Sequence, residues 1–108
     1  MLVLLDQGTP VPIRSFLKNH TVKTAAEQGW STLRNSELLN AAEDAGFELL
    51  LTTDKNLAYQ QDLSTRKIAL VVLGNSQWPA VQHYVARIVA AVNTAQPGSY
   101  VEVDIPRR

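Results

Sequence analysis

The chain has 108 residues, which suits one domain, and 45% of them are apolar, enough to build a core. Lys plus Arg and Asp plus Glu each number 10, so the formal net charge is zero, whereas a protein that holds nucleic acid by bulk charge would be basic. The absence of cysteine excludes disulfides, thiolate catalysis and zinc sites with cysteine ligands. We find no signal-peptide pattern and no apolar run near the roughly 20 residues that span a bilayer. We therefore expect a cytoplasmic single domain over residues 1–108, without a membrane segment.

Short apolar runs that suit strands alternate with segments of helical periodicity along the chain. The expected strands are Leu2–Leu5, Thr21–Thr24, Glu48–Thr52, Ile68–Leu73 and Tyr100–Ile105. The fourth run, IALVVL, is continuously apolar, as a parallel strand covered on both faces should be. This alternation predicts right-handed crossovers and an α/β fold. Its central sheet of about five strands should be mostly parallel, with helices on both faces.

The segments between these strands carry helix signals. Proline in a first turn predicts a helix that opens over residues 9–12, and residues 25–33 are expected to form a loop. Asn35 or Ser36 can cap a helix that Gly46 ends. The later expected segments are a short helical or irregular stretch at Asn56–Leu63, a long amphipathic helix at Trp78–Val92, and a flexible tail at residues 106–108.

Acidic residues stand where strands of the predicted sheet end. Asp6 follows the first strand and Asp54 the third, while Glu37 lies in the first turn of the second helix. Open parallel sheets bind ligands at the carboxyl ends of their strands. Three carboxylates in one crevice would repel unless a cation binds or one of them stays protonated. Oxygen ligands suit Mg²⁺ or Mn²⁺, which can promote phosphate ester hydrolysis.

A purely structural interpretation of these acids competes with the catalytic one. Asp54 could cap the segment that follows it, and the helix dipole alone favours Glu37 in a first turn. For either residue taken singly we favour the structural interpretation. Both acids together with Asp6, at matching positions, leave the two interpretations evenly balanced.

Several cationic and aromatic residues allow two interpretations. Lys55 could contact a phosphate, and Arg14 and Arg34 could rim the pocket, although solvated surface positions explain all three. Trp30 and Trp78 could stack on bases, but we favour packing for both. The sequence contains no glycine-rich nucleotide fingerprint, so we expect no nucleotide cofactor.

Three features together resemble the PIN-like domains, most closely the small uncharacterised DUF5615-type subgroup, which is often encoded as toxin-like partners of small antitoxins. These features are Asp6 after the first strand, the SELL helix start at residues 36–39, and the LLTTD run at residues 50–54 before a polar-aromatic stretch. The resemblance covers Leu2 to about Val92. It implies a three-layer sandwich and a metal-dependent nuclease that acts on single-stranded RNA.

The resemblance assigns roles to the acids by position. Asp6 matches the first metal-binding aspartate, Glu37 matches the acid on the second conserved helix, and Asp54 matches the aspartate of a T-x-D pattern whose threonine is Thr52. Uncharged residues stand where the family often has further acids, at Gln7, Asn56, Asn75 and Ser76. Asn56, Asn75 and Ser76 could hold water or phosphate, and Gln7 is a possible pocket contact. Weak metal affinity is therefore expected.

Three functions compete at this stage. The first is a Mg²⁺- or Mn²⁺-dependent endoribonuclease, dimeric and paired with an antitoxin-like small protein. The second is a non-cleaving PIN-like module that binds a partner protein or a second copy of itself. The third, much less expected, is a phosphoacceptor receiver domain, which should have paired acids after the first strand and a lysine after the fifth. The chain has Gln7 beside Asp6 and no lysine in SYVEVDI.

Overall fold

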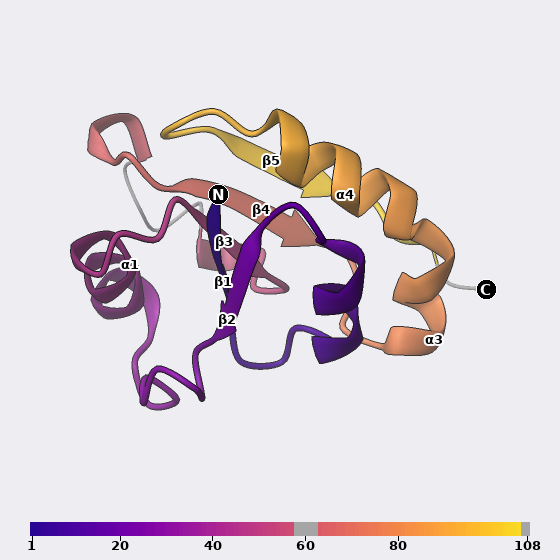
Figure 1. Cartoon of the computed structure of the whole chain (residues 1–108), viewed down its shortest axis with the longest axis horizontal. Helices are drawn as coiled ribbons and strands as arrows, with labels where there is room; N and C mark the ends of the chain where they lie inside the picture. Colours follow the sequence, from indigo (N-terminus) through magenta and orange to yellow (C-terminus); the bar gives the residue numbers. More distant parts are fainter. Residues whose placement is uncertain (58–62, 107–108) are drawn as a thin grey trace.

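A computed structural model, which describes residues 1–57 and 63–106, shows strands and helices alternating along the chain (Figure 1). The strands are β1 (Leu2–Leu5), β2 (Thr21–Thr24), β3 (Leu49–Thr52), β4 (Ala69–Leu73) and β5 (Tyr100–Val103). The longer helices are α1 (Asn35–Asp44) and α4 (Val85–Thr94). The short helical elements are η1 (Val11–Phe16), η2 (Leu63–Thr65), α3 (Trp78–Val81) and η3 (Gln82–Tyr84). None of the described helices is both long and apolar enough to cross a bilayer.

The sheet is entirely parallel, with strand order β2-β1-β3-β4-β5. This confirms the predicted α/β fold and its five strands. Every residue of β3 and β4 is buried, as the continuous apolar runs require. The chain places β2 on one side of β1 and β3 on the other, so the winding direction switches between β1 and β3. Sheets of this order bind ligands at the carboxyl ends of the strands at that switch.

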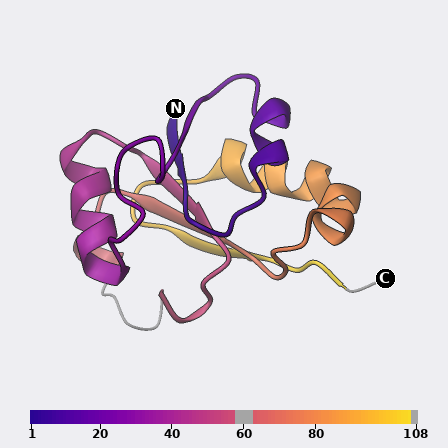
Figure 2. The same cartoon turned by 90° about the horizontal axis from the view of Figure 1, so that it is seen from below.

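Helical elements cover both faces of the sheet (Figure 2). One face packs against α1, and its buried residues are Leu4, Leu38, Leu39, Ala42, Phe47, Leu50, Leu57, Ile68, Leu70 and Val72. The other face packs against η1, α3 and α4, and its buried residues include Val3, Leu5, Ile13, Leu49, Leu51, Val71, Val81, Ile88, Val92 and Val103. Consecutive strand residues alternate between the two groups, which is the period-two pattern of a strand.

Helix α1 ends as the sequence predicts but begins one residue earlier. Gly46 has φ +88°, its N–H donates to the Glu43 carbonyl at 3.0 Å, and the Phe47 N–H donates to the Ala42 carbonyl at 2.9 Å. This pair of bonds is the Schellman arrangement, which glycine favours. The prediction of a cap at Asn35 or Ser36 is wrong, because Arg34 occupies the cap position and makes no side-chain capping bond.

Two other helical segments differ from their predictions. The expected helix at Trp78–Val92 is broken at Tyr84, whose φ of −123° and ψ of 20° leave the helical region; the apolar spacing continues across the break, so periodicity did not reveal it. The first helix is a 3₁₀ segment, η1, in which the Ile13 N–H donates three residues back to the Pro10 carbonyl. Most of the stretch expected at Asn56–Leu63 lies outside the described residues.

Candidate functional site

Asp6 sits at the exit of β1, beside the neighbouring strand β3. Its N–H donates to the Leu51 carbonyl at 2.9 Å, which holds its backbone against the end of β3. Its Oδ2 accepts a hydrogen bond from Thr52 Oγ1 at 2.7 Å, and its Oδ1 accepts one from the Gln7 N–H at 2.7 Å. The carboxylate is therefore fixed from two sides in a partly buried position.

The surroundings of Asp6 shift the pKa of its carboxyl upward from its ordinary value. Burial raises the pKa of the carboxyl above its ordinary value of 3.8, because removal from water disfavours the charge. The hydrogen bonds from Thr52 and Gln7 lower the pKa, the Asp54 charge raises it, and the Arg34 charge lowers it, in that order of size. The net shift is upward, so the site would gain from a nearby cation.

Asp54 is positioned by the same threonine that binds Asp6. The Asp54 N–H donates to Thr52 Oγ1 at 3.1 Å, and Thr52 is completely buried. Asp54 Oδ1 accepts a hydrogen bond from the Asn56 N–H at 3.0 Å, so Asp54 also serves as a turn residue, as the structural interpretation predicted. One buried hydroxyl thus links the backbone of Asp54 to the carboxylate of Asp6.

Both aspartates line one cavity of about 430 Å³ at the β1–β3 switch. The residues around it are Asp6, Gln7, Ser31, Leu33, Arg34, Leu38, Asp54, Asn56 and Leu57. The sequence pointed to both aspartates and to Gln7, Asn56 and Arg34 for this pocket. It gave no signal for Ser31 or Leu33, which lie in the irregular loop between β2 and α1.

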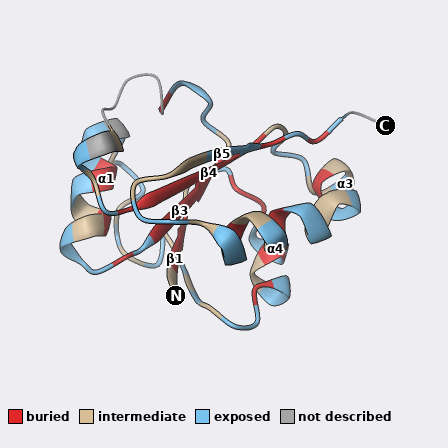
Figure 3. Cartoon of the chain, turned by 90° about the horizontal axis from the view of Figure 1, so that it is seen from above, coloured by how far each residue is buried: buried red, intermediate tan, exposed pale blue. Residues whose placement is uncertain are grey.

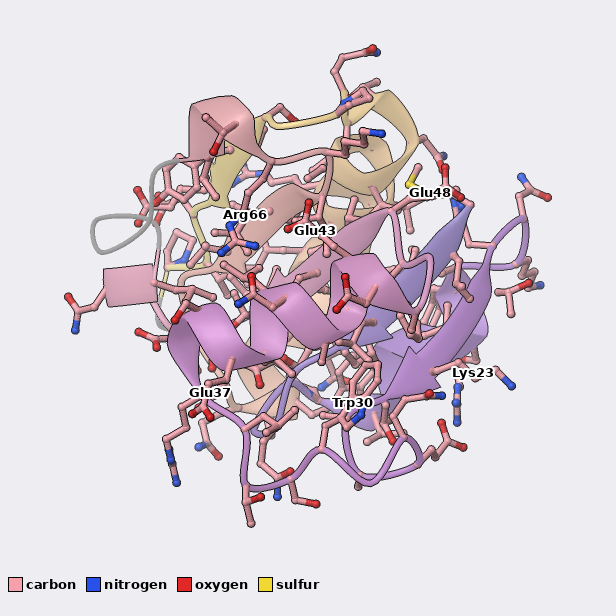
Figure 4. The ribbon with its side chains drawn as sticks, turned by 90° about the vertical axis from the view of Figure 1, so that its left-hand side faces the viewer. Lys23, Trp30, Glu37, Glu43, Glu48 and Arg66 are labelled. Atoms are coloured by element: carbon pink, nitrogen blue, oxygen red, sulfur yellow. The ribbon has the colours of Figure 1, made fainter. Side chains whose placement is uncertain are left out.

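Glu37 does not line this cavity. Glu37 would lie near the strand ends if a short connection joined β2 to α1. The loop of residues 25–34 separates the two elements instead. The first turn of α1 turns Leu38 and Leu39 toward the sheet and leaves Glu37 exposed, where Figure 4 shows it at the start of the helix. Within residues 1–57 and 63–106, no cluster of three or more histidine, cysteine or acidic side chains could hold a metal ion.

The remaining predicted contacts lie around neighbouring cavities. Asn75 and Ser76 line a cavity of about 350 Å³ at the exit of β4, and Asn75 Oδ1 accepts the Gln77 N–H at 2.8 Å as a turn residue does. Lys55 is exposed and lines a smaller hollow together with Glu102 and Asp104. These side chains therefore extend along the carboxyl edge of the sheet without joining the lining around Asp6 and Asp54.

Arg14 and the two tryptophans have structural roles. Arg14 lies on the outer side of β2, where its side chain donates to the Val22 carbonyl and pairs with Glu27. Trp30 packs on Phe47 with ring centroids 5.8 Å apart. Trp78 packs on Phe16 with ring centroids 6.1 Å apart. The packing interpretation of both tryptophans is confirmed.

The residues of the cavity fit a weakly held hard cation. Mg²⁺ is commonly bound by one or two carboxylates, keeps several waters, and takes its other ligands from substrate phosphates. Asp6 and Asp54 offer two carboxylates whose mutual repulsion a cation would relieve, and each carboxylate oxygen can accept more than one bond. Arg34 in the same lining adds a cationic group suited to phosphate.

Comparisons with models of protein families, with curated proteins and with solved structures return no match. The resemblance to PIN-like domains therefore stays a prediction. The parallel α/β sheet and the shared cavity of Asp6 and Asp54 stand on the structure alone.

Proposed function

We propose that this protein is a Mg²⁺- or Mn²⁺-dependent endoribonuclease of the PIN-like type that hydrolyses phosphodiester bonds in single-stranded RNA. One observation carries the proposal: Asp6 and Asp54, which exit adjacent parallel strands, line one cavity at the switch point and are both tied to the buried Thr52 hydroxyl. Two carboxylates in one cavity at this place suit a metal that acts on phosphate.

In this proposal each residue of the cavity has a distinct task. A bound Mg²⁺ or Mn²⁺ would activate water and offset the charge that develops on the phosphate. Asp6 and Asp54 hold the ion, and Thr52 holds both of them. Arg34 binds a phosphate oxygen of the substrate, while Gln7 and Asn56 supply uncharged polar contacts. Glu37, exposed at the start of α1, adds negative charge outside the lining and is not an inner ligand.

The proposal extends to the cellular partners that the resemblance implies. The protein would be the cytoplasmic, toxin-like member of a pair and would be held inactive by an antitoxin-like small protein. Its zero net charge means that RNA binding would depend on local groups such as Arg34 rather than on bulk attraction.

A second candidate is a non-cleaving PIN-like module that binds protein. The observation in its favour is that only two of the residues lining the cavity, Asp6 and Asp54, are acidic. Glu37 lies outside the lining, and Gln7 and Asn56 within it carry no charge. In that case the site would be a remnant, and the surfaces of the fold would carry the function.

The test is cleavage of a mixed-sequence single-stranded RNA with Mn²⁺, with and without chelator. Asp54→Asn removes one ligand charge and should lower the rate by at least about 10-fold, because changes around a metal commonly cost 10- to 100-fold. Asp44→Asn makes the same change at the exposed far end of α1 and should cleave like the wild type. Calorimetric titration with Mn²⁺ should show the same ranking. If folded wild-type protein neither binds Mn²⁺ nor cleaves RNA, the nuclease proposal is wrong and the non-cleaving, protein-binding module is favoured.

A further inference from the structure

Strand β5 lies at one end of the sheet and has β4 as its neighbour (Figure 3). The Leu70 N–H donates to the Ser99 carbonyl and the Gly74 N–H donates to the Val103 carbonyl, each at 2.9 Å. Backbone groups of alternate strand residues point to the same side, so Ser99, Val101 and Val103 face β4. The N–H and C=O of Glu102 must then point away from the sheet.

The opposite edge of the sheet is closed by side chains and loop groups. On β2, the Val22 carbonyl accepts two hydrogen bonds from Arg14, at 2.8 and 3.2 Å. The Thr24 N–H donates to Glu27 Oε1 at 2.8 Å, and the Thr24 carbonyl accepts from the Gln28 N–H at 3.2 Å. The Val22 carbonyl and both backbone groups of Thr24 are therefore occupied, which hinders edge-to-edge pairing at β2.

No such capping bond to the backbone of Glu102 is found in the part of the chain that the structure describes. Glu102 is exposed, and Val101 next to it is 38% exposed, one of few large apolar side chains so open in this fold. We propose that β5 is a homodimer interface, at which a second copy of this chain adds its own β5 in antiparallel orientation. The two sheets would then continue into one.

Charge selects the register of this pairing. Opposite residues on antiparallel strands interact directly, and like charges placed opposite each other are destabilising. With Val101 on the twofold axis, Glu102 lies opposite Tyr100 of the second copy and Asp104 lies opposite Gly98. The next register would place Glu102 opposite Glu102. The first arrangement separates the carboxylates and joins two exposed valines.

The difference between the two edges also limits the assembly. A copy that has one available edge can pair with another copy through the same edge only, and an interface of this kind closes at two subunits. A filament would require β2 to receive β5, and the contacts of Arg14 and Glu27 block that strand. Since β5 is only four residues long, we expect a weak dimer at the small end of specific interfaces.

The test is the oligomeric state, measured by sedimentation over a concentration series. Glu102→Pro removes an N–H that points away from β4, a substitution that edge strands tolerate, and should shift the protein to monomer. Glu102→Thr keeps that N–H and removes the charge, so its dimer should be at least as strong as that of the wild type. Circular dichroism confirms that each variant is folded.

A second variant keeps the test decisive if Glu102→Pro does not fold. Val101→Lys changes an exposed side chain and would place two ammonium groups on the twofold axis, so it should also give monomer. Wild-type and Glu102→Thr proteins that remain monomeric throughout the series would overturn the proposal, as would folded Glu102→Pro or Val101→Lys proteins that dimerise like the wild type. Neither outcome depends on RNA cleavage, so failure here is distinct from failure of the proposed nuclease.

Discussion

Thr52 explains why a carboxylate can stand at the end of so apolar a strand. Its hydroxyl donates to Asp6 and accepts from the Asp54 backbone, so one buried polar group serves both strand exits. A buried hydroxyl without partners would destabilise the fold, and here both of its partners belong to the site. The residue is therefore both a core residue and a positioning residue.

Replacing Thr52 with valine should destabilise the protein by about 1–3 kcal/mol, since it leaves the Asp54 N–H and one Asp6 oxygen without their partner. Chemical denaturation measures this change. Thr53→Val is the matched control, because the neighbouring Thr53 is only partly buried and makes no hydroxyl bond in the described residues, so its cost should be well below that of Thr52→Val. Equal costs for the two variants would contradict the role given to Thr52.

The raised pKa of Asp6 predicts a pH-dependent term in stability. The folded state holds the Asp6 proton more tightly than the unfolded chain, because burial raises the pKa above 3.8. The resulting stabilisation is complete at pH below that ordinary value and is lost as the pH rises through the raised pKa. With chelator present, Asp6→Asn should not show this loss. Its free energy of unfolding, measured relative to that of the wild type, should therefore rise between acid and neutral pH. Asp44→Asn retains Asp6 and should follow the wild type; a parallel curve for Asp6→Asn would refute the prediction.

At the scale of elements, the turn before β5 depends on close backbone approach. Gly98 has φ +74°, and a Cβ there would lie 2.8 Å from the Arg66 carbonyl oxygen. Gly46, after α1, has φ +88° with nothing within 4 Å of such a Cβ. Both positions favour glycine, but only Gly98 also excludes a methyl group by contact.

Thermal or urea unfolding of two alanine variants separates these effects. Gly46→Ala should cost about 1–2 kcal/mol, the penalty for a left-handed residue with a side chain. Gly98→Ala should cost at least about 1 kcal/mol more, because overpacking of a tight site adds about 1–3 kcal/mol. If the two variants were equally stable, the close approach of Gly98 to Arg66 would not be a real constraint.

The elements also show what the sequence could and could not predict. Each strand was placed to within about two residues. For β1, β3 and β4 the reason is that a buried parallel strand leaves an unbroken apolar run, whereas the outer strands β2 and β5 carry polar residues and are more exposed. The break at Tyr84 was missed because the buried spacing from Val81 to Val92 continues through it. Asp6 and Asp54 were located because a strand end fixes their place, whereas the direction of Glu37 depends on the loop at residues 25–34, which no periodicity describes.

At the scale of the molecule, every strand pairing is parallel, so each needs a crossover rather than a tight turn. No hairpin therefore joins any two of the described strands, and their sheet forms only by contacts between distant segments. Such topologies fold more slowly than those built from local contacts.

The hydrogen bond from Thr52 to Asp6 joins residues 46 positions apart in the chain. During synthesis Asp6 leaves the ribosome well before Thr52 does, and the two meet only when β3 docks beside β1. A nascent chain that ends within α1 has the first aspartate but neither the hydroxyl that orients it nor the second aspartate. If the protein cuts RNA, the activity appears only after translation has passed the third strand, which spares the ribosome and messenger that are producing it until then.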